Sequence, residues 1–172
     1  RLSPFAVVDA IVAKRNLGTR IGLAPVVVAL GPGFTAGRDA HAVVETNRGH
    51  DLGRVLLTGS AQPDTSVPGL VGGRAGDRVL RSPAAGAVAP LREIGDLVSA
   101  GDPVLSVGGV EVRTAISGVV RGLIRPGYAA SPGLKVADVD PRGSRESCFT
   151  VSDKARAVAG GVLEAILALA PG

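Results

Sequence analysis

The chain has 172 residues, a length that suits one ordinary domain or two small ones. It contains 25 Gly and 12 Pro, and aromatic residues make up 2% of it. Its apolar residues are mostly Val, Leu and Ala, so the composition predicts short strands joined by tight turns, in a mainly β fold with some α structure. The single cysteine, Cys148, excludes an intramolecular disulfide framework and fits a reducing, cytoplasmic environment.

The net charge is +4, and Arg supplies sixteen of the nineteen basic residues. These arginines are scattered and few aromatic residues could stack on bases, so we expect no nucleic-acid partner. The planar guanidinium group favours bidentate contacts with phosphate or carboxylate. No apolar run approaches the roughly 20 residues of a membrane helix, and we expect no membrane partner.

The sequence begins at Arg1 and contains no Met, so we expect a segment upstream of it. Residues 1–77 are predicted to form a small α/β domain. Within it, the apolar run 26–30 is typical of a fully buried strand. Glycines follow that strand directly.

Residues 31–38 read Gly-Pro-Gly-Phe-Thr-Ala-Gly-Arg, with the spacing GxGxxxG. Backbone N–H groups that follow a strand can converge on an anion, and Arg38 could add a guanidinium. The spacing matches neither the dinucleotide fingerprint nor a Walker loop. A tight turn that needs positive φ at the glycines is the alternative interpretation.

Both histidines of the chain, His41 and His50, lie just after this loop, among carboxylates. If residues 39–46 are extended, a period of two places Asp39, His41 and Glu45 on one face. A metal site is conceivable, and so is a hydrogen-bonded cluster that holds the loop. The predicted ligand-binding residues are Gly31, Gly33, Thr35, Gly37, Arg38, Asp39, His41, Glu45, Arg48 and His50.

Turn-forming residues 64–76 predict a linker that ends near residue 77. Beyond it, residues 80–107 align without a gap on residues 112–139, at a constant offset of 32. In each copy a Gly opens an apolar strand and two turns follow. Neither unit can bury a face alone, so we expect the two copies to pack on one another within a domain at 78–142.

The strings IGDLVSAGDPVLSV and ISGVVRGLIRPGYAASPGLKVADV resemble the barrel-sandwich hybrid of biotinyl and lipoyl carrier domains. Such carriers present a modifiable Lys in the hairpin between their two halves. The corresponding hairpin here, 107–110, contains no Lys. The resemblance therefore implies the architecture without the carrier chemistry.

The segment 143–172 is predicted to end in a helix over 152–169, capped by Ser152 or Asp153, with an apolar face at 3.6-residue spacing. Gly160 and Gly161 lie inside it, which indicates close packing against another element or a second chain. Before the helix, Cys148 could carry sulfur or selenium as a thiolate, although an unpaired cysteine is more often a small buried residue.

The string APVVVALGPGFTAGRDAHAVVETNRGHDLGR at 24–54, DVDPR at 138–142 and SDKARAVAGGVLEAIL at 152–167 together resemble the YqeB family. The resemblance implies an accessory factor of the selenium-dependent molybdenum hydroxylase system. It also implies an upstream Rossmann-like segment that this chain lacks.

We therefore predict a non-catalytic accessory or maturation factor for such a hydroxylase. It would bind an anionic, phosphate-bearing ligand of molybdopterin type together with a protein partner from the hydroxylase or its maturation machinery, and a homo-oligomer is conceivable. The cofactor itself is not identified by the sequence. The alternative is a metal-dependent hydrolase or transferase using Asp39, His41, Glu45 and His50.

Overall fold

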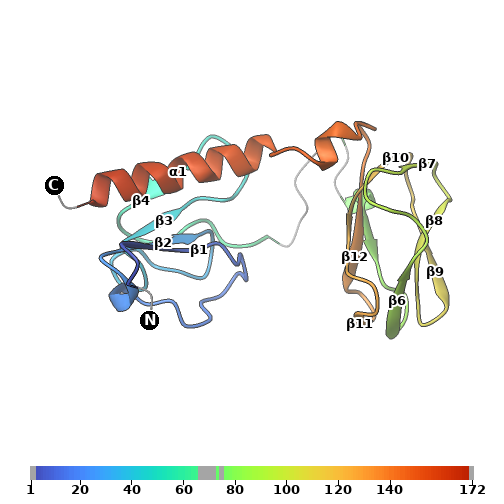
Figure 1. The fold of residues 1–172 in the computed structure, drawn as a ribbon, viewed down its shortest axis with the longest axis horizontal. Coiled ribbons are helices and arrows are strands. Elements are labelled where there is room, and N and C mark those ends of the chain that lie inside the picture. The colour runs from blue at the N-terminus through green and yellow to red at the C-terminus, as the bar shows by residue number, and fades with distance from the viewer. Residues whose placement is uncertain (1–2, 66–72, 74–75, 171–172) are drawn as a thin grey trace. The chain divides into compact units, whose positions relative to one another are not determined.

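The computed structural model describes residues 3–65, 73 and 76–170. The chain forms two compact units. Unit 1 comprises Arg1–Ser66 and Val151–Gly172, and unit 2 comprises Val67–Thr150. Most of the predicted linker lies outside the described residues. The architecture is mainly β with one C-terminal α-helix, as the composition predicted (Figure 1).

Unit 1 is built on a four-stranded sheet with the order β1-β2-β3-β4. Its elements are β1 (Ala6–Asp9), η1 (Ile21–Leu23), β2 (Val26–Leu30), β3 (Ala42–Val44), β4 (Val55–Leu56) and α1 (Asp153–Leu169). Strands β1, β2 and β3 run parallel, and β4 is antiparallel to β3. All five residues of β2 are buried, as expected of a central parallel strand covered on both faces.

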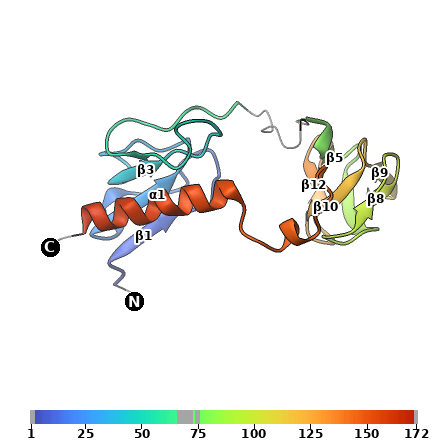
Figure 2. The ribbon, with the colours of Figure 1, turned by 90° about the horizontal axis from the view of Figure 1, so that it is seen from above.

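Helix α1 covers one face of this sheet (Figures 1 and 2). The Ala155 N–H donates to the Ser152 hydroxyl at 3.2 Å, so Ser152 is the N-cap. Val158 and Ala165 are buried against β2 and β3, with Val162, Ile166 and Leu169 packed around them. The bounds of the helix agree with the predicted range 152–169, and the apolar face predicted from the 3.6-residue spacing packs on the core.

Gly161 is the point of closest approach between α1 and the sheet. A Cβ there would collide with the Gly53 carbonyl oxygen and lie 2.9 Å from Val44 Cγ1. Gly160 differs, because a Cβ there would meet no atom within 4 Å. Of the two glycines, one serves packing inside unit 1 and the other faces outward.

Unit 2 consists of two open four-stranded sheets, in the orders β5-β12-β10-β7 and β11-β6-β8-β9. Its elements are η2 (Gly76–Arg78), β5 (Val79–Arg81), β6 (Gly86–Pro90), β7 (Leu97–Val98), β8 (Pro103–Val107), β9 (Val110–Arg113), β10 (Gly118–Leu123), β11 (Ala129–Ala130), β12 (Lys135–Asp140) and η3 (Glu146–Cys148). Side chains from both sheets form one core cluster.

The two copies of the repeat interlock within these sheets. Each copy supplies four strands at the offset of 32, and each sheet takes its central pair from one copy and its edges from the other. The bonds between copies repeat as well. The Arg81 guanidinium donates to the Gly133 carbonyl at 2.9 Å, and Arg113 donates to the Gly101 carbonyl at 2.8 Å. The matched arginines therefore tie the two copies together.

Asp140 anchors the end of β12 through the guanidinium groups of Arg121 and Arg142, at 2.8 Å and 2.7 Å. Hydrogen bonding from Arg142 outweighs burial and holds the pKa of Asp140 well below its ordinary value of 3.8. Because its pKa is lowered in the folded state, the carboxylate stabilises the fold fully above about pH 4, and this stabilisation is lost as the pH falls toward the lowered pKa.

We expect Asp140→Asn to lower the free energy of unfolding at pH 7 by about 2 kcal/mol, because the ion pairs are lost. The difference from the parent chain should shrink progressively below pH 4. Urea unfolding across this pH range measures it, with Glu111→Gln as the control that removes an exposed ion pair with Arg113. A difference that stays constant down to the lowest pH would contradict the assignment.

Among the described residues there is no helix with the length and apolar character that a membrane crossing requires.

Candidate functional site

The glycine loop, residues 31–38, uses most of its backbone N–H groups inside unit 1. The Gly31 N–H donates to a carbonyl of β3 at 2.9 Å, and the Gly37 N–H donates to the Ala40 carbonyl at 2.8 Å. The N–H groups of residues 35, 36, 38 and 39 also donate within the unit. Of the described residues, none accepts the N–H of Gly33 or Phe34. The loop is therefore mainly a tight turn.

Gly33 packs against the segment that follows β1. Its φ is +102°, and a Cβ there would lie 2.6 Å from the Cα of Arg15 and 2.9 Å from the carbonyl carbon of Lys14. Val12 and Lys14 in that segment have φ of 56° and 64°. Left-handed conformations are strained in non-glycine residues, above all in a β-branched one, and they are common at functional sites.

Arg38 and Asp39 form an ion pair at the surface. The guanidinium donates to the carboxylate at 2.9 Å and 3.2 Å, which holds the pKa of Asp39 below its usual value. The Arg38 side chain is 72% exposed. Asp39 also accepts the Thr35 N–H at 2.8 Å, and the Thr35 hydroxyl lies 3.1 Å from that of Ser60. Asp39 thus closes the glycine loop.

His41 binds the sheet through its imidazole. The Val27 N–H donates to His41 Nδ1 at 2.9 Å, so Nδ1 carries no proton and its lone pair is occupied. The strand that follows His41 is shorter than the predicted extended segment 39–46. It is β3, which begins at Ala42, and Asp39 lies in the turn before it. His50 is exposed on the turn after β3.

Glu45 holds two loops together as a buried carboxylate, with 3% exposure. It accepts the N–H groups of Thr46, Asn47 and Gln62, each at 2.7 Å. These bonds satisfy both oxygens, which leaves Glu45 little capacity to act as a base or a metal ligand. In the described parts of the chain, no three His, Cys, Asp or Glu side chains are placed to hold a metal ion. The hydrogen bonds of Glu45 therefore fit a structural carboxylate.

A cluster of three cations, Lys14, Arg48 and Lys154, lies close to Glu45. Burial lowers the pKa of Lys154, the nearby charges of Lys14 and Arg48 lower it further, and the Glu45 carboxylate opposes them. The Arg48 guanidinium donates to both oxygens of Asp153, at 2.8 Å and 3.0 Å. Lys14 lies 3.9 Å from Asp64. Of these three cations, only Arg48 was predicted from the sequence to bind a ligand.

These three cations come from separate segments that meet at one edge of the sheet. Lys14 follows β1, Arg48 follows β3, and Lys154 lies in the first turn of α1. Because β1, β2 and β3 are parallel, the segments after them share the carboxyl edge, where α/β sheets bind ligands. The N-terminus of α1 adds partial positive charge. We call Lys14, Arg48 and Lys154 the basic edge.

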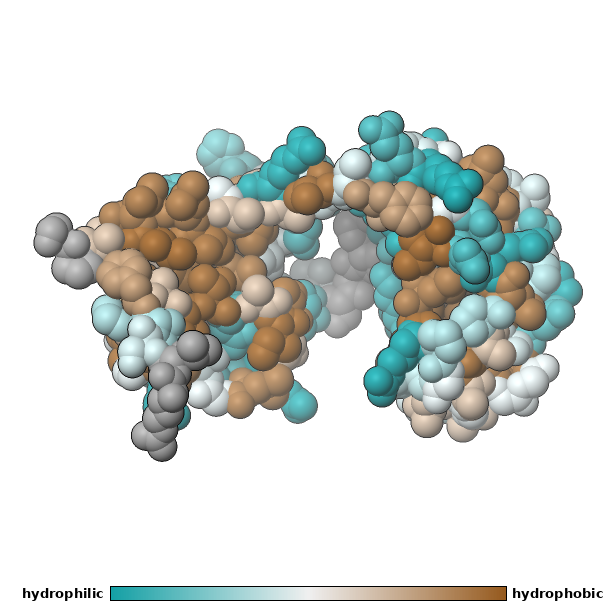
Figure 3. All heavy atoms as spheres, viewed as in Figure 1, coloured by the Kyte–Doolittle hydropathy of each residue, from teal (hydrophilic) through white to brown (hydrophobic). Residues whose placement is uncertain are grey.

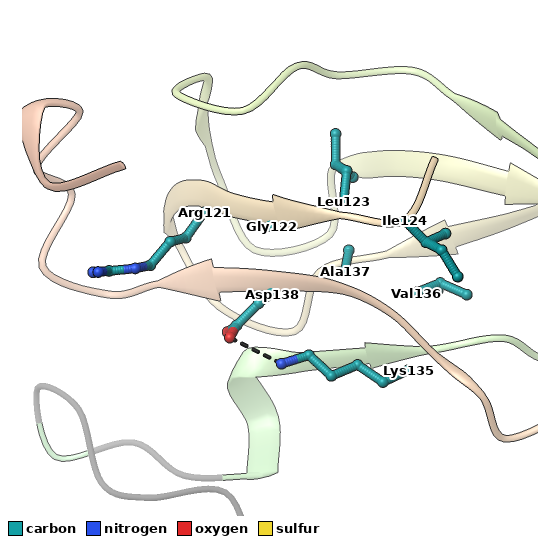
Figure 4. A pocket seen from close by; sticks show the side chains of 8 residues that line it. All are labelled: Arg121, Gly122, Leu123, Ile124, Lys135, Val136, Ala137 and Asp138. Carbon is teal, nitrogen blue, oxygen red and sulfur yellow. Dashed lines mark hydrogen bonds and ion pairs between the residues drawn. The ribbon is translucent and has the colours of Figure 1, made fainter. Parts of the chain in front are cut away.

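Two cavities are lined by none of the three cations of the basic edge. One, of about 260 Å³, borders Glu45 and β4 in unit 1 and contains the Asp51–Arg54 ion pair. The other, of about 400 Å³, lies between β10 and β12 in unit 2 (Figure 4). Its Lys135 turns toward Asp138 at 3.1 Å. The charged side chains that line these cavities are engaged in ion pairs or, for Glu45, in hydrogen bonds with backbone N–H groups.

Cys148 lies in η3 of unit 2 and is half-buried. Its Sγ is 3.7 Å from the Val120 carbonyl oxygen and 3.9 Å from that of Ser144. These contacts fit a small packed side chain with a weak S–H donor.

Three solved structures share local similarity with the chain. They are an aspartoacylase family protein from Mesorhizobium loti (22% identity, 37% of this chain, 22% of that chain, TM-score 0.34), the ectoine utilization protein EutE (DoeB) from Ruegeria pomeroyi (26%, 48%, 27%, 0.35) and a succinylglutamate desuccinylase/aspartoacylase from Rhodobacter sphaeroides (19%, 67%, 45%, 0.36). TM-scores this low do not establish a shared fold.

No family model matches the chain. A curated relative, "Uncharacterized protein YqeB" of Escherichia coli (strain K12), is 54% identical over 168 residues, which are 98% of this chain and 31% of the relative. The chain therefore spans about a third of the length of that relative. Identity of this extent supports the resemblance to the YqeB family that the three long motifs predicted.

Proposed function

We propose that the chain is the ligand-binding part of a non-catalytic accessory factor for a selenium-dependent molybdenum hydroxylase, and that it binds a phosphate-bearing ligand of molybdopterin type at the basic edge. The hydroxylase context rests on the family resemblance. The binding role rests on the three cations that meet at the carboxyl edge of the sheet.

The observation that carries the binding role is the position of Lys154, which lies partly buried at this edge near Lys14 and Arg48. Lys154 is partly buried beside two other cations, an arrangement that destabilises its charged form. A bound anion would relieve this repulsion. The N–H groups of Gly33 and Phe34 and the first turn of α1 supply further donors that suit phosphate oxygens.

Unit 2 supplies the proposed docking module. The interlocked copies of the repeat resemble a barrel-sandwich hybrid, and a rigid β unit of this kind would present a surface to the hydroxylase or its maturation machinery. The 107–110 hairpin contains no Lys, so the proposal involves no carrier lysine.

Isothermal titration with pyrophosphate and with a phosphorylated pterin tests the binding role. We expect binding by the parent chain and a loss of at least tenfold in Lys14→Gln and Lys154→Gln, because each removes a charge-assisted hydrogen bond. Lys135→Gln removes a lysine from unit 2 and should leave the affinity unchanged. Arg38→Gln should also have little effect, since Arg38 pairs with Asp39.

If the parent chain and Lys154→Gln bound pyrophosphate with equal affinity, the basic edge would not be the binding site. If Arg38→Gln were the variant that lost binding, the glycine loop would be the site instead. Copurification with a molybdenum hydroxylase tests the accessory role separately from either result.

A further inference from the structure

The outward face of α1 is apolar along most of its length. Between Arg156 and Ala168, the exposed residues are Arg156, Ala159, Gly160, Leu163, Glu164, Leu167 and Ala168. Leu163 is 58% exposed and Leu167 is 68% exposed. Figure 3 shows the apolar surface gathered over α1. Neighbours three and four apart share a helix face, so these side chains form one stripe, unlike isolated surface leucines.

Gly160 lies within this stripe, and among the described residues none would contact a Cβ at this position. Open space surrounds the position where its Cβ would be, in contrast to Gly161. A glycine in mid-helix disfavours the helix relative to alanine. Its absent side chain lets another helix approach closely at this point.

The charges of the stripe are symmetric about Gly160. Arg156 lies four residues before it and Glu164 lies four residues after it. If two copies of α1 pair antiparallel about a two-fold axis at Gly160, each Arg156 is level with the partner copy's Glu164. A two-fold interface must be complementary to itself, and Arg156 and Glu164 meet that requirement in charge.

We propose that the chain forms a homodimer through antiparallel pairing of α1, centred on Gly160. In this register Leu163 of each copy lies level with the small residue Ala157 of the other. This interface is independent of the proposed ligand at the basic edge.

Sedimentation equilibrium of the full 172-residue chain tests the proposal. We expect a concentration-dependent dimer in the parent chain and a monomer in Leu163→Lys. Leu97→Lys is the matched control, because Leu97 is 70% exposed on β7 of unit 2, and it should still dimerise. Thermal melts by circular dichroism verify that each variant is folded.

Charge reversal tests the pairing geometry. Arg156→Glu alone and Glu164→Arg alone each replace two attractions by two repulsions and should weaken the dimer by about tenfold. Both changes favour the helix dipole, so the fold itself should not suffer. The double variant should recover the dimer, and an equimolar mixture of the two single variants should form a heterodimer in which both contacts are complementary.

A parent chain that stays monomeric at all concentrations overturns the proposal. So does a dimer that is insensitive to charge reversal, a mixture that forms no heterodimer, or a dimer that Leu97→Lys disrupts as strongly as Leu163→Lys does.

Discussion

Gly161→Ala should lower the free energy of unfolding by about 2 kcal/mol, the scale of an overpacked core. The added Cβ would press on the Gly53 carbonyl oxygen and on Val44 Cγ1, so α1 must move off the sheet. The backbone of Gly53 cannot readily move away, because its φ is +85° and its Cα packs against the Ala157 carbonyl oxygen of α1. Urea unfolding, at a dilution where the chain is monomeric, measures the effect.

The neighbouring glycine provides a matched control in the same helix. Gly160→Ala should raise the free energy of unfolding by about 1 kcal/mol, because alanine favours a helix and the new Cβ meets nothing. The helix-propensity gain is common to both variants, and the difference between them isolates the contact with the sheet. Equal stabilities would show that α1 does not pack on Gly53 as described.

Glu45→Ala should destabilise unit 1 by about 3 kcal/mol, because three backbone N–H groups lose their acceptor and the Thr46 N–H is buried. Glu45→Gln should cost less, since the amide oxygen still accepts. Thermal and urea unfolding measure both. Glu93→Ala, which removes an exposed carboxylate from unit 2, should change stability by less than about 0.5 kcal/mol.

This prediction separates a structural carboxylate from a chemical one. If Glu45 were a base or a metal ligand on a rigid scaffold, its removal would leave the unfolding transition where it is. An unchanged midpoint in Glu45→Ala would therefore reopen the metal-dependent alternative that the hydrogen bonds of Glu45 and His41 disfavour.

Local pattern was enough to predict β2, α1 and the strands of the repeat. Apolar continuity identified β2, and 3.6-residue spacing with a Ser cap identified α1. The constant offset of 32 identified the strands of unit 2 as two equivalent sets. Each of these signals depends on neighbouring residues or on a fixed spacing along the chain. Such signals can be read from the sequence without the tertiary structure.

Sequence alone could not decide how the polar groups near the glycine loop are used. Asp39, His41 and Glu45 were predicted to line a pocket, but each binds backbone N–H groups of its own unit. A side chain shows in sequence what it can accept or donate, while its actual partner depends on which backbone groups the sheet leaves unpaired nearby.

The basic edge required the tertiary structure for the same reason. Lys14 and Lys154 are 140 positions apart in the sequence. They meet because parallel strands bring their carboxyl ends to one edge. The close contact between Gly53 and Gly161 also allows α1 to pack directly on the sheet. The sequence determined where β2, α1 and the strands of the repeat form. Only their packing decided which charges share a site, because Coulomb interactions depend on distance in space and not on separation along the chain.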